Sequence, residues 1–311
     1  MQKLAEILRH RKFAVLDGAF ATELEALGIN INDPLWSALA LIDKEDMIAK
    51  VHLSYLKAGA DIITSSSYQA TVSGFMRKNL SKERAVDLIA KSVRIAKQAR
   101  DSFIKTEDFL NSERAVPQVA ASLGPYGAYL ADGSEYRGDY KAGFDDLKSF
   151  HKERIEIIAK EKPDLYALET VPVLSEALAV SELLNEMNLQ TPMWISFSCC
   201  DGEHISDGTG ISECGRKLDA LENVAAVGIN CTQPKYIESL VKNLRAVTRK
   251  AIIVYPNSGE QYDPVTKTWS GSSEEFLSSV MKWYAAGANI IGGCCRTTPA
   301  DIKKIASMAA L

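Results

Sequence analysis

Short apolar and β-branched runs recur along the whole chain, and longer stretches of mixed polarity separate them. Most of these runs are continuously apolar and do not alternate between apolar and polar residues, which is typical of parallel strands covered on both faces. The run MWISFSCC alternates more than the others. The pattern predicts eight strands, which lie at residues 13–19, 60–68, 116–124, 164–170, 193–200, 225–232, 251–257 and 289–296.

Helical periodicity fills the stretches between the predicted strands. In SKERAVDLIAKSVRIAKQA, Ser81 is suited to cap a helix whose inner stripe is Ala85, Leu88, Ile89, Ser92, Ala96 and Ala99. Strand–helix units repeat without a linker, a low-complexity segment or an evident internal repeat. They predict an α/β fold, a single (β/α)8 TIM barrel that forms one domain over residues 1–311. The alternative is a doubly wound open sheet, but no GxGxxG or Walker-type loop follows the first predicted strand.

Composition narrows the classes of partner and the compartment. The formal net charge is −4, and no cluster of Lys and Arg stands out, so nucleic acid is not an expected partner. The chain has no run of about 18 apolar residues, so no membrane span is expected. The first residues lack the pattern of a secretory signal, and we expect a cytoplasmic protein. Its six cysteines are then expected to be thiols or metal ligands and not disulfides.

Candidate functional residues stand where predicted strands end, which is where TIM barrels place their active sites. These residues are Asp17, Glu169, Cys231, Cys294 and Cys295. The series Thr298, Pro299, Asp301 predicts a helix start, because it combines a capping hydroxyl, an early proline and a carboxylate near the positive end of the helix dipole. It therefore places Cys294 and Cys295 at the end of the eighth strand, and Pro234 places Cys231 similarly after the sixth.

The three thiols can converge, because alternate strands of a barrel contribute side chains to a common layer. Adjacent strand residues point to opposite faces, so the backbone must bend near Gly292 and Gly293 for both Cys294 and Cys295 to face inward. Three thiolates would leave one position of a tetrahedral zinc ion open, as in catalytic zinc sites. The alternative is that these cysteines pack as small apolar residues. We interpret Cys199, Cys200 and Cys214 in that way.

Several motifs resemble those of the homocysteine S-methyltransferase family, most closely its members that use S-methylmethionine. The matching segments are LDGAFATELE, SSYQAT, SLGPYGAYLADGSEYRGDY, ALET, SDGT, GINC, VYPNSGE and GGCCRTTP. The resemblance implies a catalytic Zn²⁺ bound by Cys231, Cys294 and Cys295. It also implies that Asp17 and Glu169 hold the amino group of homocysteine, and the N–H groups of Gly18 and Ala19 are candidate donors to its carboxylate.

The expected partners are therefore homocysteine and a sulfonium methyl donor, and the product is methionine. Zinc deprotonates a bound thiol, and a sulfonium donor already carries a good leaving group, so no general acid is required. S-methylmethionine is the preferred donor and S-adenosylmethionine the alternative. Aromatic faces attract cations, and Tyr126, Tyr129, Tyr136 and Tyr140 are candidates to shelter the sulfonium. A thiol-based redox sensor or zinc-storing protein remains the alternative from another class.

Overall fold

The computed structural model describes residues 2–31, 33–259, 261–263, 268–270 and 274–311. Its main sheet contains eight parallel strands in the order β1-β10-β7-β6-β5-β4-β3-β2. The strands are β1 (Ala14–Val15), β2 (Ile62–Thr64), β3 (Gln118–Leu123), β4 (Leu165–Val171), β5 (Met193–Phe197), β6 (Val224–Asn230), β7 (Ala251–Tyr255) and β10 (Ile290–Ile291). Each of them lies within or overlaps one of the eight predicted runs.

The sheet closes on itself. Leu16, directly after β1, forms a parallel bridge with Ile62 of β2, so the first and last strands in the order are neighbours. The TIM barrel predicted from the sequence is confirmed, and the open-sheet alternative is wrong. β1 and β10 are the shortest strands of the barrel, with two residues each.

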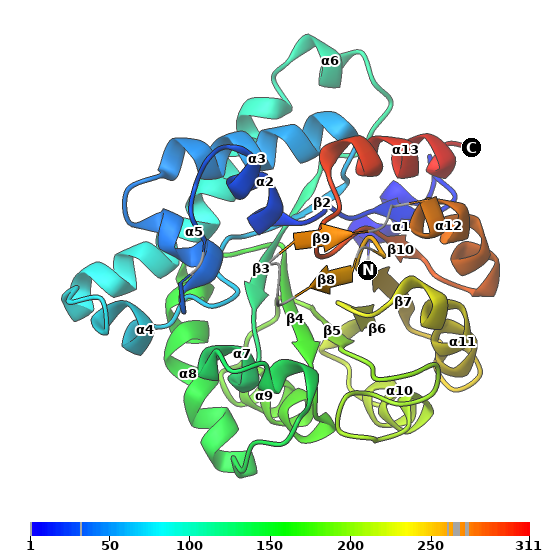
Figure 1. The fold of residues 1–311 in the computed structure, drawn as a ribbon. Helices are drawn as coiled ribbons and strands as arrows, with labels where there is room; N and C mark the ends of the chain where they lie inside the picture. Colours follow the sequence, from blue (N-terminus) through cyan, green and yellow to red (C-terminus); the bar gives the residue numbers. More distant parts are fainter. Residues whose placement is uncertain (1, 32, 260, 264–267, 271–273) are drawn as a thin grey trace.

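Helices surround the strands, as Figure 1 shows along the barrel. The α-helices are α1 (Gln2–Ile7), α2 (Phe20–Ala26), α3 (Glu45–Ala58), α4 (Val72–Met76), α5 (Lys82–Phe103), α6 (Glu107–Leu110), α7 (Tyr126–Leu130), α8 (Phe144–Lys160), α9 (Leu174–Glu186), α10 (Ile211–Asp219), α11 (Pro234–Arg245), α12 (Glu274–Ala286) and α13 (Pro299–Ala309). Two 3₁₀ helices are η1 (Trp36–Leu41) and η2 (Ser134–Tyr136). The predicted cap of α5 is confirmed, since Ser81 Oγ accepts a hydrogen bond from the Arg84 N–H at 3.2 Å.

Two apolar cores hold the barrel. The larger lies between the strands and the helices and includes the buried stripe of α5. The smaller joins inward-facing strand residues such as Ala120 and Trp194 to Ile7 of α1. At Gly228 of β6, an added Cβ would lie 1.7 Å from the Ile253 carbonyl oxygen, so only glycine allows β6 to pack against β7. These cores fix the strand ends, where the candidate residues lie.

A hairpin that the apolar pattern did not predict follows β7. Its strands are β8 (Gln261–Asp263) and β9 (Thr268–Ser270), which pair antiparallel with Gln261 opposite Ser270. Three-residue strands in a polar stretch carry too short a pattern to detect. The motif VYPNSGE leads into this hairpin, and its last residue, Glu260, lies outside the described residues.

Within the described part of the chain, no helix combines the length and the apolar character needed to cross a bilayer.

Candidate active site

A cavity of about 510 Å³ opens where the barrel strands end. We call its inner side the strand-end wall; it consists of Asp17, Glu169, Cys231, Cys294 and Cys295. A second part of the lining, which we call the loop wall, comes from connecting segments and includes Trp36, Tyr68, Glu135 and Tyr136. All residues predicted to bind the metal or homocysteine line this one cavity, since Gly18 and Ala19 also border it.

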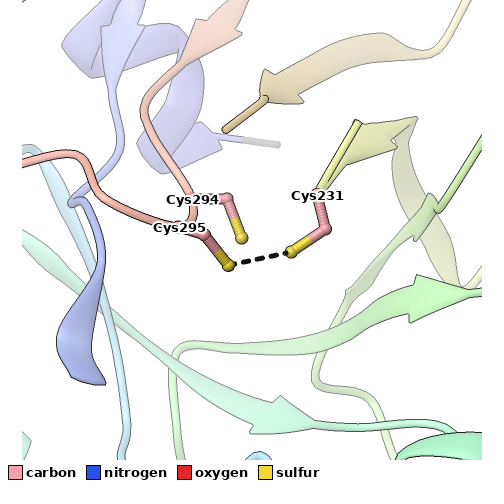
Figure 2. Close-up of side chains that lie close together, drawn as sticks. All are labelled: Cys231, Cys294 and Cys295. Carbon is pink, nitrogen blue, oxygen red and sulfur yellow. Dashed lines mark hydrogen bonds between the residues drawn. The ribbon is translucent and has the colours of Figure 1, made fainter. Parts of the chain in front are cut away.

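The sulfur atoms of Cys231, Cys294 and Cys295 lie within 4.8 Å of one another. The Sγ atoms of Cys231 and Cys295 are 3.8 Å apart, and Figure 2 shows the three side chains pointing toward a common centre. A tetrahedral metal ion with sulfur ligands at about 2.3 Å requires pairs of sulfurs about 3.8 Å apart. The three thiols therefore fit a metal ion. Among the described residues, Cys199, Cys200 and Cys214 belong to no such group.

Backbone geometry aims Cys231 at this centre. Cys231 directly follows β6 and has φ of 47°, a left-handed conformation that is uncommon for a residue with a side chain. Its N–H still donates to the Tyr255 carbonyl oxygen of β7 at 3.3 Å, so the turn starts directly at the end of β6. α11 then begins at Pro234, as predicted.

Cys294 and Cys295 follow a bend just beyond β10. The Gly293 N–H donates to the Asp17 carbonyl oxygen at 3.1 Å, and the Cys294 N–H donates to the Pro256 carbonyl oxygen at 2.7 Å. The expected bend is present, but the two glycines serve close packing and have no left-handed backbone. An added Cβ would lie 2.6 Å from Leu16 Cβ at Gly292 and 2.3 Å from Thr297 Oγ1 at Gly293.

The helix start behind the cysteine pair is confirmed. Thr298 and Asp301 form a capping box at the start of α13, in which Thr298 N–H donates to Asp301 Oδ2 at 3.0 Å. The box fixes the segment that connects Cys295 to the helix, which limits the freedom of the pair.

The thiols also affect one another. Hydrogen bonds from Cys231 and Cys294 lower the pKa of the Cys295 thiol well below its ordinary value. Hydrogen bonding with Cys231 and Cys295, together with burial, raises the pKa of Cys294. A cation at the centre of the trio would favour ionisation of all three thiols.

Asp17 is buried in the wall that also carries the thiols and is held by Thr64. The Thr64 N–H donates to Asp17 Oδ2 at 2.7 Å, and the Thr64 hydroxyl donates to the same oxygen at 3.1 Å. Burial raises the pKa of Asp17 to about 8, although the hydrogen bonds from Thr64 oppose the rise. A bound cation would restore the ionised form, so the site suits an ammonium group.

Glu169 lies near Asp17 at the end of β4. Ser122 Oγ donates to Glu169 Oε1, and the Tyr255 hydroxyl also hydrogen-bonds its carboxylate. Burial raises the pKa of Glu169 to about 7, and the charge of Cys231 adds to the rise. Two buried carboxyl groups with raised pKa values on one wall make a cation site and not an anion site.

A side-chain clamp joins the backbone at Glu169 to the backbone at Cys231. Asn230 Oδ1 accepts from the Thr170 N–H at 2.7 Å, and Asn230 Nδ2 donates to Thr170 Oγ1 at 2.7 Å. Thr170 itself has a left-handed φ of 59°, and Cys231, which follows Asn230, has a left-handed φ of 47°. The sequence showed GINC and ALET as separate motifs; the structure shows that Asn230 holds them in register.

The two predicted carboxylate-binding amides differ in their surroundings. The Ala19 N–H already donates to Thr297 Oγ1 at 3.1 Å, and the Ala19 carbonyl oxygen accepts from the Tyr55 hydroxyl at 3.0 Å. Gly18 packs against the same two side chains, because an added Cβ would lie 2.9 Å from each. This makes Gly18 the better candidate donor, with Ala19 serving to fix the turn.

The loop wall differs from the aromatic shelter suggested by the sequence. Of the four candidate tyrosines, Tyr136 lines the cavity, and its hydroxyl lies 3.7 Å from Cys231 Sγ. Tyr126, Tyr129 and Tyr140 instead form a ring cluster with Phe150 of α8. The sequence reasoning missed Trp36 and Tyr68, whose ring centroids lie 6.0 Å apart at the cavity. Tyr68 stands within the SSYQAT motif, which could have indicated it.

The histidines contribute nothing to the cavity lining. His52 and His151 are buried, and His204 contacts Asp201 on the surface. These positions are those of structural or surface residues. His151 forms a buried pair with Glu176 at 2.7 Å, which also receives the Tyr126 N–H and the Tyr140 hydroxyl.

A barrel with thiols and buried carboxylates gathered at its strand ends has the organisation of a TIM-barrel enzyme. A family model described as homocysteine S-methyltransferase matches residues 14–309, and the chain belongs to this family of methyltransferases. Homocysteine S-methyltransferase YbgG of Bacillus subtilis is 49% identical over 311 residues, which are 99% of this chain and 98% of the relative. Homocysteine S-methyltransferase 3 of Zea mays is 50% identical over 94% of this chain and 88% of its own.

Solved structures agree with the assignment. The metallated form of the homocysteine methyltransferase MmuM from Escherichia coli superposes with a TM-score of 0.88 at 40% identity, covering 99% of this chain and 100% of that chain. Its oxidised form gives a TM-score of 0.89 at the same identity. These findings support a homocysteine methyltransferase that acts on small molecules, and they suggest a metal at the thiol cluster.

Proposed function

We propose that this enzyme transfers a methyl group from S-methylmethionine to the thiol of homocysteine with the help of Zn²⁺ held by Cys231, Cys294 and Cys295. The observation that carries the proposal is the gathering of these thiols beside Asp17 and Glu169 in one cavity. S-adenosylmethionine is the second candidate donor. Residues 1–311 act as one methyltransferase barrel in this proposal. The free thiols of the site favour a reducing compartment such as the cytoplasm.

Zinc suits this donor set. Three cysteine sulfurs within 4.8 Å of one another would leave one position of a tetrahedral ion for a further ligand, which is the arrangement of catalytic zinc sites. When bound, zinc would hold the homocysteine sulfur as a thiolate at neutral pH, where a free thiol is mostly protonated. The Tyr136 hydroxyl, 3.7 Å from Cys231 Sγ, supplies a hydrogen bond that orients this ligand from outside the trio.

Asp17 and Glu169 orient homocysteine. Their carboxyl groups take the ammonium group, and the pKa values raised by burial fall again once this cation is bound. The Gly18 N–H is placed to donate to the substrate carboxylate. Holding the amino-acid end at the strand-end wall directs the substrate sulfur toward the cysteines. Positioning of this kind can lower a reaction barrier by up to roughly 7 to 11 kcal/mol.

Transfer from a sulfonium donor needs no proton from the protein. The donor C–S bond breaks, its electron pair stays on the donor sulfur, and the homocysteine sulfur supplies the pair for the new S–CH₃ bond. S-methylmethionine and homocysteine thus give two molecules of methionine. Trp36 and Tyr68 belong to the cavity lining, and the ring electrons of such aromatic residues can stabilise the cationic donor.

A methyl-transfer assay tests the proposal. Protein stripped with a chelator and protein reloaded with zinc are incubated with homocysteine and either S-methylmethionine, S-adenosylmethionine, betaine or a methylated folate. We expect methionine formation from S-methylmethionine after reloading and strong loss of activity after stripping. Full activity of the stripped protein would contradict the zinc role, and preference for a donor without a sulfonium would contradict the donor class.

A further inference from the structure

One carboxylate of the loop wall has no role in the scheme above. Glu135 belongs to η2 and lines the cavity, and its Oε2 atom is buried without a hydrogen-bond partner among the described residues. A buried carboxylate oxygen that lacks a partner is costly, and native proteins retain such groups mainly where a ligand satisfies them. Glu135 is therefore a candidate ligand-binding residue.

The loop holds Glu135 firmly. Its carbonyl oxygen accepts from Ser198 Oγ at 2.7 Å, which ties η2 to the segment after β5. At Gly127 an added Cβ would lie 2.7 Å from the Glu135 nitrogen, so α7 and η2 pack without a side chain between them. The buried Glu176 accepts from the Tyr126 N–H at 2.6 Å, which fixes α7 from behind. These contacts hold the loop that carries the Glu135 carboxylate in place.

Charges around the cavity define the ligand. Of the described lining residues, five are carboxylates, and the cation Arg296 lies 3.8 Å from one of them, Glu25. Burial raises the pKa of Glu135, and the neighbouring charges of Cys231 and Asp132 add to the rise, so a cation beside it would restore ionisation. Homocysteine brings one positive charge, which Asp17 and Glu169 accommodate. A second cationic ligand is needed for Glu135.

We propose that Glu135 recognises the positive charge of the methyl donor, an amino acid with a sulfonium centre, and so sets the specificity for charged over neutral sulfur compounds. The proposal rests on the proposed function, because it assumes a sulfonium donor. Tyr136, the next residue, contacts Cys231, so Glu135 stands beside a residue that reaches the thiols, and it lines the same cavity.

The donor loses its positive charge during the reaction, and this determines how KM and kcat should respond when Glu135 is replaced. As the methyl group leaves, the sulfonium becomes a neutral thioether, so Glu135 stabilises the bound donor more than the transition state. Removing the Glu135 charge should then raise the KM for the donor more than it lowers kcat. A residue that only supported the loop would change both parameters and would also affect homocysteine.

The test uses the zinc-loaded enzyme and the Glu135→Gln variant, which keeps the side-chain shape. Calorimetry without homocysteine measures the Kd of S-methylmethionine and of methionine, its neutral thioether counterpart. We expect the Kd of S-methylmethionine to rise by about tenfold to a hundredfold, while that of methionine changes by less than about threefold. Asp139→Asn removes an exposed charge from the same loop and is the matched control; it should change either Kd by less than about twofold.

Two outcomes overturn the inference: an unchanged Kd for S-methylmethionine, or equal weakening of both ligands. Glu135→Asp keeps the charge and should retain part of the discrimination, which also decides the question if Glu135→Gln folds poorly by circular dichroism. Wild-type protein that transfers no methyl group from any sulfonium would contradict the proposed function itself. Active wild type with an unaffected Glu135→Gln variant would reject the role of Glu135 alone.

Discussion

The strand-end wall and the loop wall line the same cavity, but the chain holds them by different means. Residues of the strand-end wall stand within a barrel strand or no more than four positions after one. Backbone hydrogen bonds to neighbouring strands fix them, as Cys231 N–H to Tyr255 shows. Glu135 and Tyr136 of the loop wall depend on packing within connecting segments and on buried groups such as Glu176. The difference suggests that the strand-end wall carries the chemistry and the loop wall tunes which donor enters.

The largest effect should come from the thiol trio. Cys294→Ser replaces one sulfur by a much poorer zinc ligand, and we expect kcat/KM to fall by roughly a thousandfold or more. Steady-state methyl transfer measures it. Cys200→Ser, which alters an exposed cysteine outside the group, is the matched control and should retain nearly full activity. Substantial activity in Cys294→Ser would remove the chemical role from the strand-end wall.

Glu169→Gln tests the other half of the same wall. The variant keeps the shape but loses the charge that pairs with the ammonium group, so the KM for homocysteine should rise by about tenfold to a hundredfold. The KM for the donor should stay nearly constant, which is the reverse of the result expected for Glu135→Gln. Glu182→Gln, on the outer surface beside Lys148, controls for a general effect of charge. If Glu169→Gln affected only the donor, the two walls would have been assigned in the wrong order.

Removing the clamp between Asn230 of β6 and Thr170 of β4 should have a smaller effect, on stability. Asn230→Ala removes two hydrogen bonds and leaves the buried Thr170 N–H without its acceptor, so the free energy of unfolding should fall by about 1–3 kcal/mol. Denaturant unfolding measures the change. A double-mutant cycle with Thr170→Ala isolates the coupling, and additive effects of the two substitutions would contradict a clamp.

The pH dependence of stability follows from Asp17. Its pKa in the metal-free fold is about 8, above its ordinary value of 3.8, so between these values the folded state binds the proton and the unfolded state does not. The stabilisation from this group is complete below pH of about 4 and is lost as the pH rises through about 8. Thermal unfolding of metal-free protein should show Asp17→Asn gaining stability relative to wild type from pH 5 to pH 8.5. A constant difference would contradict the raised pKa.

Tyr136→Phe should produce the smallest change. It removes one hydrogen bond to Cys231 from the loop wall and keeps the ring, so we expect a loss of kcat/KM of only about threefold to tenfold. Comparison with Cys294→Ser under the same assay shows whether the walls differ as proposed. A loss as large as that of Cys294→Ser would place Tyr136 in the reaction chemistry.

Sequence reasoning reached the strand-end wall more easily than the loop wall for a physical reason. Strand ends are marked by the switch from apolar runs to residues such as Pro234 and Thr298, which begin helices, so the sequence alone places Cys231 and Cys294. Their convergence also followed from the layering of a barrel. The fold was predictable to the same extent, because continuous apolar runs reveal buried parallel strands.

Positions in loops depend on tertiary contacts that have no periodic pattern. Four tyrosines of one segment looked equivalent in the sequence, but Phe150 of α8 packs against Tyr126 and Tyr129 while Tyr136 reaches the cavity. Trp36 lines the cavity although its segment has no strand pattern, and its backbone has a left-handed φ of 46°. The Asn230 clamp was hidden for a similar reason, since it joins two motifs that are sixty residues apart.

Zinc content per chain tests the central claim most directly. Wild-type protein, Cys294→Ser and Cys200→Ser are purified with zinc, freed of loosely bound ions and measured by metal analysis. We predict one zinc per chain in wild type and in Cys200→Ser, and close to none in Cys294→Ser. One full equivalent of zinc in Cys294→Ser, or a wild type that is active without zinc, would contradict the account.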